Sequence, residues 1–146
     1  MAIKASTGLR NYLLDTGALD TALAAGFIKI YDGTAPTSAN DAIAGNLLVT
    51  ISIDGLGTGI NMAATASNGS IQKSGSEVWE GTIGVTGTAT YYRHTEAADT
   101  GASSTTEKRI QGTIGVAGED MNLSSTSLVA TATQSIDYYV INLPTN

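Results

Sequence analysis

Gly81-Thr82-Ile83-Gly84-Val85-Thr86-Gly87 returns later in the chain as Gly112-Thr113-Ile114-Gly115-Val116-Ala117-Gly118, and each phrase ends a run that alternates in polarity. The apolar or glycine positions are Trp79, Gly81, Ile83 and Val85 in the first run and Ile110, Gly112, Ile114 and Val116 in the second. A two-residue period of this kind is typical of a β-strand with one buried face. We therefore predict that the two phrases are core strands of a β-structure and lie next to each other.

Further strands are predicted on both sides of these phrases, with turn signals at short intervals. Residues 47–53 alternate cleanly, and Asn68-Gly69 is a strong signal for a tight hairpin turn. The other candidates are residues 27–31, 88–94, 121–129 and 133–143. Seven or eight such strands predict a mainly β fold, an antiparallel β-sandwich or jelly roll. A Rossmann-like fold is excluded because helices do not alternate with the strands.

One helical segment is predicted, at residues 7–25. Ser6 or Thr7 can cap its first turn, and Leu9 and Tyr12 share a face. We expect a single domain over residues 1–146, with this short N-terminal helical segment followed by a β-core at 27–143. The segment has two alternative roles: it covers one end of the β-core, or it is an arm that reaches a neighbouring subunit.

The composition excludes several classes of partner and chemistry. The net charge is −6 with a pI of about 4.4, and the seven cations are scattered, so we expect neither nucleic acid nor a membrane as a partner. The absence of cysteine excludes disulfides and thiolate chemistry. We also expect neither a signal peptide nor a membrane span. The 21 Thr and 13 Ser favour an uncharged polar surface, which suits packing against another subunit.

The candidate catalytic and metal sites have simpler explanations. The glycine-rich stretch 55–59 has the spacing of a flexible turn and lacks the lysine of a phosphate loop. His94 is the only histidine, and no Gly-x-Ser-x-Gly elbow supplies a nucleophile for it. The acidic pairs 77/80 and 119/120 lack the spacing of a calcium loop. We therefore predict that the protein is not an enzyme and has no catalytic, cofactor-binding or metal-binding residues.

Aromatic residues suggest two kinds of binding surface. Trp79 and the tyrosine pairs at 91/92 and 138/139 are candidates for a sugar-binding platform. Adjacent strand residues point to opposite faces, so one tyrosine of each pair is predicted inside and the other outward, at a sheet surface or a subunit interface. The predicted interface residues are Tyr12, Tyr91, Tyr92, Arg93 and His94.

Motifs spread over nearly the whole chain carry a resemblance to a known group of proteins. They begin with Thr7-Gly8-Leu9-Arg10-Asn11-Tyr12-Leu13-Leu14-Asp15-Thr16-Gly17 and Gly26-Phe27-Ile28-Lys29-Ile30-Tyr31-Asp32-Gly33-Thr34-Ala35-Pro36. They continue at residues 77–82, 87–93, 99–101, 109–113, 122–125 and 136–139. With these motifs the chain resembles small virion-associated structural proteins of tailed bacteriophages.

The resemblance implies a β-rich virion protein, and we expect a capsid decoration or cement protein that binds the outside of the head and stabilises contacts between major capsid subunits. Its partners would be the major capsid protein and further copies of itself, with a trimer expected. It would be made in the host bacterial cytoplasm and carried on the capsid surface of the virion. Two alternatives stay open: a tail or head-tail connector component and, from another class, a carbohydrate-binding or host-attachment module.

Overall fold

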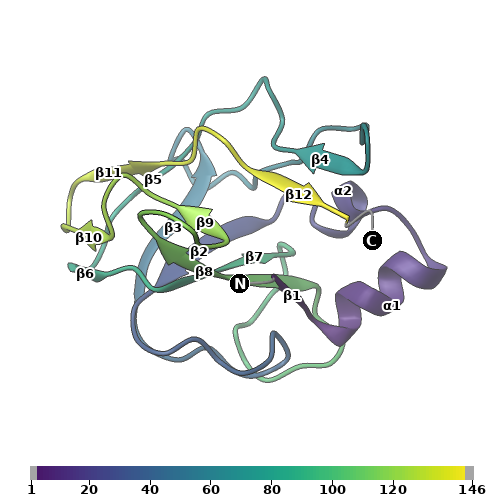
Figure 1. Cartoon of the computed structure of the whole chain (residues 1–146), viewed down its shortest axis with the longest axis horizontal. Helices are drawn as coiled ribbons and strands as arrows, with labels where there is room; N and C mark the ends of the chain where they lie inside the picture. Colours follow the sequence, from purple (N-terminus) through teal and green to yellow (C-terminus); the bar gives the residue numbers. More distant parts are fainter. Residues whose placement is uncertain (1–2, 144–146) are drawn as a thin grey trace.

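The computed structural model describes residues 3–143, and its centre is one eight-stranded sheet (Figure 1). The strands are β1 (Lys4–Ala5), β2 (Phe27–Tyr31), β3 (Leu47–Ile53), β5 (Trp79–Thr82), β7 (Tyr91–Thr95), β8 (Arg109–Gly115), β9 (Met121–Asn122) and β11 (Thr133–Ser135). They run in the order β1-β8-β7-β2-β3-β5-β11 with antiparallel pairing, and β9 joins β8 in parallel. The predicted mainly β, antiparallel fold is confirmed.

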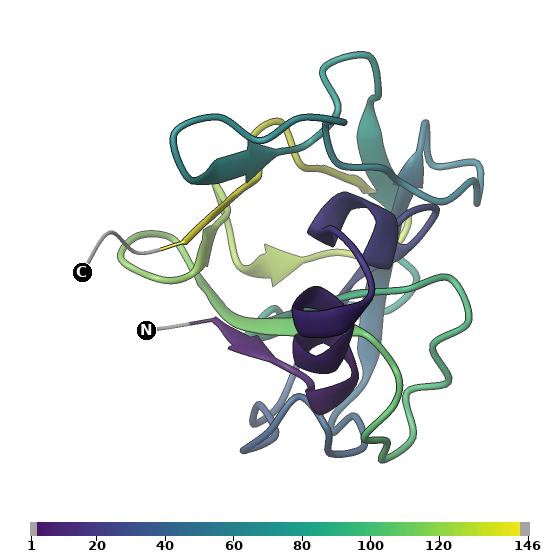
Figure 2. The same ribbon diagram turned by 90° about the vertical axis from the view of Figure 1, so that its right-hand side faces the viewer.

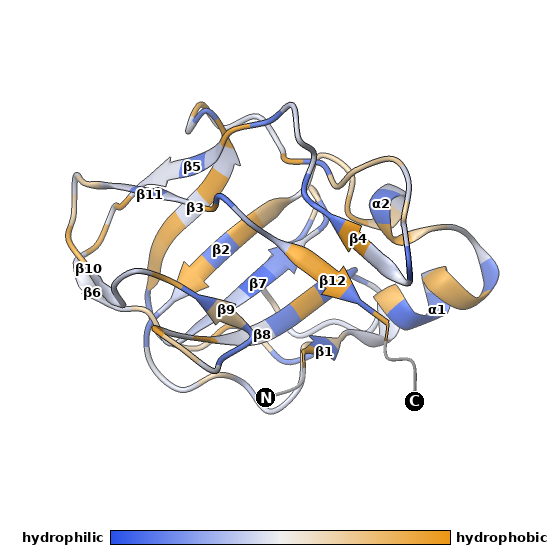
Figure 3. Cartoon of the chain, turned by 45° about the horizontal axis from the view of Figure 1, so that its top comes forward, coloured by the Kyte–Doolittle hydropathy of each residue, from blue (hydrophilic) through white to orange (hydrophobic). Residues whose placement is uncertain are grey.

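Two small sheets complete the β-structure. One pairs β6 (Gly87–Thr88) with β10 (Ser127–Leu128), and the other pairs β4 (Ser70–Gln72) with β12 (Val140–Asn142). In Figure 3, β12 passes in front of β7 and β8. The buried residues of the main sheet and Ile141 of β12 belong to the same hydrophobic cluster. The small sheet therefore forms a second layer over the core.

The predicted helical segment is present as α1 (Thr7–Asp15) and α2 (Leu19–Ala22). Of the two candidate caps, Ser6 caps α1, because its Oγ accepts the N–H of Leu9 at 3.2 Å. Leu9 and Leu23 are buried, and both helices lie over one end of the sheet in Figure 2. No helix within residues 3–143 is long and apolar enough to cross a membrane.

Each of the two Gly-Thr-Ile-Gly-Val phrases begins in a strand of the main sheet, but these two strands are not neighbours. The first is in β5 and the second in β8, and three strands (β7, β2 and β3) lie between them. The predicted buried face is confirmed for Trp79, Ile83, Ile110 and Ile114, but it was wrong for Val85 and Val116, which are 44 and 65 % exposed. The prediction of adjacency was wrong because an alternating pattern specifies the buried face of a strand and not the strand it pairs with.

The Asn68-Gly69 prediction is confirmed in detail. Both residues have positive φ, 51° and 73°, as a tight primed turn requires. Ser67 and Ser70 exchange two backbone hydrogen bonds across it, at 2.8 and 2.9 Å. The turn precedes β4, which pairs with β12.

The two predicted C-terminal strands are each interrupted. Residues 121–129 contain β9 and β10, and residues 133–143 contain β11 and β12. Residues 136–139 connect β11 to β12 without belonging to a strand, and the alternation breaks there because Asp137 and Tyr138 are both exposed. The interruption turns the chain from the edge of the main sheet into the second layer.

Candidate functional site

The β7 residues of the predicted interface lie inside the protein. Tyr91, Tyr92, Arg93 and His94 are 0, 2, 0 and 0 % exposed, so they offer no surface to a partner in this structure. The expectation that one tyrosine of the 91/92 pair points outward was wrong, because the loops 32–46 and 96–108 pack over the face of β7 that faces away from the core. Tyr12 is half-buried, with the Lys108 ammonium 5.4 Å from its ring centre.

Tyr91 fixes the first of these loops to the sheet. Its ring stacks on Tyr31 with centroids 5.0 Å apart, and its hydroxyl bonds the backbone of Ala44, donating to the carbonyl at 2.5 Å and accepting from the N–H at 3.0 Å. Burial is the main reason why the pKa of Tyr31 rises to about 12. The tyrosines are therefore neutral structural groups.

Arg109 fixes both loops. Its guanidinium pairs with Asp99 and Glu107, and it also donates to the carbonyls of Ala102 at 2.7 Å and Ala39 at 3.2 Å. The Arg109 side chain is 0 % exposed and that of Asp99 is 1 % exposed. Five donors in a rigid fork suit such a position, where several acceptors converge on one buried group.

Arg93 is held by neutral groups. Its Nε–H donates to Gln111 Oε1 at 2.9 Å, and Gln111 in turn donates to the Pro36 carbonyl at 2.7 Å. Burial, and secondly the charge of Arg109, lowers the pKa of Arg93. Together the two arginines and Gln111 form a polar layer that seals the loops onto the sheet, which is a structural role.

On the other face of β7, His94 is part of the core. Its Nδ1 lies 3.3 Å from the Tyr139 hydroxyl, and its ring meets Trp79 edge-on at 6.2 Å. Complete burial lowers the pKa of His94 to about 3, so the imidazole is neutral at physiological pH.

Two other candidate groups are also tied into the structure. Trp79 is 1 % exposed, and its Nε1–H donates to Glu77 at 2.8 Å, so it cannot serve as a sugar platform. Asp120 accepts hydrogen bonds from the N–H and hydroxyl of Thr113, at 2.9 and 3.1 Å. Within residues 3–143, no three His, Asp or Glu side chains are grouped to hold a metal ion.

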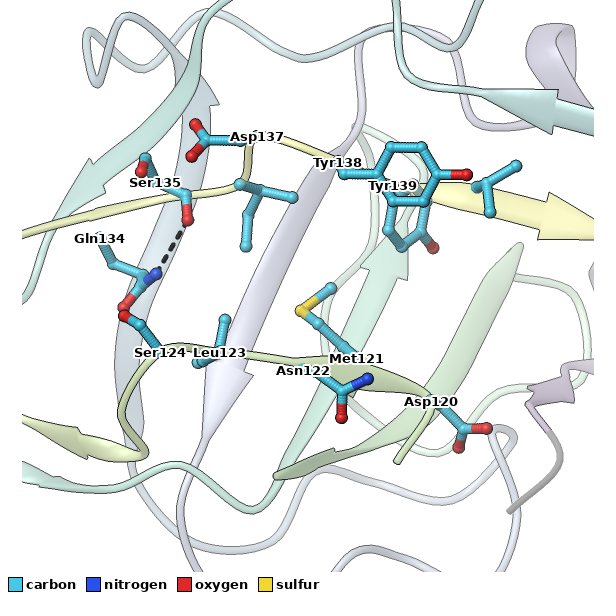
Figure 4. Close-up of a pocket in the computed structure, with 12 residues that line it drawn as sticks. Asp120, Met121, Asn122, Leu123, Ser124, Gln134, Ser135, Asp137, Tyr138 and Tyr139 are labelled. Atoms are coloured by element: carbon cyan, nitrogen blue, oxygen red, sulfur yellow. Dashed lines mark hydrogen bonds between the residues drawn. The ribbon is translucent and has the colours of Figure 1, made fainter. Parts of the chain in front are cut away.

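A groove lies between two extended segments, residues 120–124 and 134–140 (Figure 4). It has a volume of about 430 Å³, within the range of ligand sites. Its floor is made of buried side chains: Met121, Leu123, Ile136 and Tyr139. Its rim is polar and includes Asp120, Asn122, Ser124, Gln134, Ser135, Asp137 and Tyr138.

Each segment turns an unpaired backbone edge toward this groove. Leu123 N–H donates to the Gly115 carbonyl at 2.9 Å, so the intervening Asn122 directs its N–H and C=O away from β8. Ile136 N–H donates to the Trp79 carbonyl at 2.8 Å, and the antiparallel ladder likewise turns the backbone of Ser135 away from β5. The groove is thus the open seam between the two ends of the main sheet.

Tyr138 stands on the rim of the seam and is 76 % exposed, whereas Tyr139 is 6 % exposed and lies in the floor. The prediction that this pair divides between outside and inside is confirmed. The sequence pattern did not indicate the seam, because it predicted two continuous strands at residues 121–129 and 133–143. One feature of the sequence does indicate an acidic surface in this part of the chain: no lysine, arginine or histidine follows Arg109.

Comparisons with protein-family models, with curated proteins and with solved structures give no match for this chain.

Proposed function

We propose that this chain is a structural protein of a tailed-phage virion, a decoration or cement protein that binds the outside of the head and stabilises contacts between major capsid subunits. Its partners in this proposal are the major capsid protein and further copies of itself, as a trimer. The proposal rests on the resemblance in its sequence motifs and on one feature of its surface.

That feature is the presence of several exposed apolar side chains at each end of the molecule's long axis. At one end, α1 carries Leu13 and Leu14, which are 42 and 85 % exposed (Figure 1). At the other end, near β6 and β10, Leu47, Val85 and Val129 are 40, 44 and 57 % exposed.

Hydrogen bonds join the three segments that carry the residues of the second end. Val85 N–H donates to the Leu48 carbonyl at 3.4 Å, and Ala130 N–H donates to Thr86 Oγ1 at 3.0 Å. Apolar groups at both ends of a rigid subunit suit a protein that bridges two neighbours. Because many copies would bind the same shell, modest contacts from each copy would together stabilise the shell substantially.

Both alternatives remain distinguishable from this proposal. A tail or head-tail connector component would bridge subunits in the same way but in a ring. A carbohydrate-binding module would have to use Tyr138, because Trp79 is buried.

Quantitative mass spectrometry of purified virions tests the proposal. A decoration protein is expected at hundreds of copies per particle. A ring-like copy number of about six or twelve, an expectation of connector symmetry, would favour the connector instead, and absence from the particle would overturn both.

A further inference from the structure

We infer that the seam between residues 120–124 and 134–140 binds an extended segment of a partner polypeptide that carries lysine or arginine, and that this segment adds as a strand between β9 and β11. The inference concerns a different surface from the two apolar ends and does not depend on the virion assignment.

The first argument is the state of the two edges. The backbone of Asn122 points away from β8 and that of Ser135 points away from β5, and both residues line the groove. Unpaired N–H and C=O groups along a strand edge are a template for another strand. Edges exposed to solvent are usually blunted by lysine or proline, and residues 120–124 and 134–140 contain neither.

One of the groove-facing backbone groups already has a hydrogen-bond partner within the protein. The Gln134 side-chain amide donates to the Ser135 carbonyl at 2.8 Å, as the dashed line in Figure 4 shows. This bond comes from a flexible side chain at the rim, so an incoming backbone N–H can replace it. Met121 and Leu123 point from their segment toward the opposite one, and they offer an apolar floor to alternate side chains of an added strand.

The charge of the groove indicates which side chains the added strand carries. The 37 residues from Ile110 to Asn146 contain Glu119, Asp120 and Asp137 and no cation. Asp120 and Asp137 lie on opposite segments of the groove. Asp120 is hydrogen-bonded to Thr113, so a cationic side chain on the bound strand would meet the exposed Asp137 carboxylate, whereas an acidic strand would be repelled.

A saccharide fits these observations less well. It would stack on Tyr138 at the rim and bond the side-chain amides and carboxylates. It would leave the groove-facing backbone groups of Asn122 and Ser135 without hydrogen-bond partners, whereas an added strand would bond them. The two ligands can be separated by removing the groove-facing N–H of Ser135, which an added strand would use and a saccharide stacked on Tyr138 would not.

The test uses the full chain and an array of ten-residue peptides in which valine or threonine alternates with other residues, with lysine or glutamate at each position in turn. Lysine-bearing peptides are expected to bind, and their glutamate counterparts to bind at least about tenfold more weakly. Fluorescence anisotropy of the best peptide then gives its Kd, which should rise with salt.

Ser135→Pro provides the backbone test. It removes the groove-facing N–H while the ladder bonds of Gln134 and Ile136 to β5 remain, a position where proline is tolerated. The Kd is expected to rise at least about tenfold, and circular dichroism checks that the variant is folded. A peptide methylated on alternate backbone nitrogens makes the same test on the unaltered protein.

Asp137→Lys is the charge test, and Asp15→Lys on α1 is its matched control, because both change one exposed carboxylate. Only the first is expected to weaken binding. The inference is overturned if no peptide in the array binds, or if Ser135→Pro and backbone methylation leave the Kd unchanged. It is equally overturned if oligosaccharides bind through Tyr138 and displace the peptide, or if the seam proves to be occupied by a second copy of the chain.

Discussion

Arg109 and Asp99 form an ion pair inside the protein, with their side chains 0 and 1 % exposed. The pair joins β8 to the loop 96–108, and Arg109 extends the connection to the loop 32–46 through the Ala39 carbonyl. These contacts bury β7 on the side away from the hydrophobic core. The fold is therefore held by a polar layer as well as by an apolar one.

Asp99→Asn should destabilise the protein by about 3 kcal/mol, because it leaves Arg109 buried with a weaker partner. The free energy of unfolding in urea measures the loss. Glu96→Gln is the control, since the Glu96 and Lys108 side chains are 18 and 23 % exposed and their pair should contribute less than the fully buried one. Equal losses in the two variants would contradict the structural role of the buried pair.

Stability should fall as the pH drops below about 6.5, because His94 is neutral when folded and gains a proton when unfolded. Its pKa is about 3 in the fold, against an ordinary value of 6.5. Its stabilising contribution is full above pH 6.5 and decreases down to pH 3, which gives about 2 kcal/mol of loss between pH 7.5 and pH 5. Urea unfolding at the two pH values checks this, and in His94→Gln the loss should largely disappear.

Gly81→Ala should be strongly destabilising, by about 3 kcal/mol, because a Cβ there would lie 2.2 Å from the Thr50 carbonyl oxygen on β3. Gly84→Ala is the control within the same phrase, since its Cβ would meet the nearest atom at 3.9 Å. Thermal unfolding of both variants distinguishes them. A tolerated Gly81→Ala would mean that β5 and β3 are not packed as described.

Ser6→Ala should cost about 2 kcal/mol, because the Ser6 hydroxyl accepts the N–H groups of Leu9 and Arg109 and donates to the Glu107 carbonyl at 2.7 Å. The change removes the helix cap and the side-chain hydrogen bond to β8 together, while the backbone bond from Ser6 to Arg109 remains. Thr16→Ala at the other end of α1, where the hydroxyl contacts only the exposed Asp15, should change stability by less than about 0.5 kcal/mol. Chemical denaturation compares the two.

Local patterns in the sequence predicted local structure well. The strand at 47–53, the turn at Asn68-Gly69 and the capped helix after Ser6 were each indicated by residues within a few positions of one another. The strands that β5 and β8 pair with could not be predicted in this way, because the same local sequence pattern fits two different places in the sheet.

The burial of Arg93 and Gln111 was equally hidden from the sequence. Polar residues on a strand normally indicate a solvent-facing side, and here two loops cover that side and supply backbone acceptors. The seam arises from a different cause. Its two segments were predicted as strands, but the gap between them depends on how far the whole sheet curls, which no short stretch encodes.

The virion assignment is tested most directly by a cryo-EM reconstruction of the phage head. The account predicts density for this chain on the outer surface at every equivalent capsid joint, with α1 contacting one neighbour and the β6–β10 end contacting another. Density confined to the tail or the portal region, or a head surface without this protein, would contradict it.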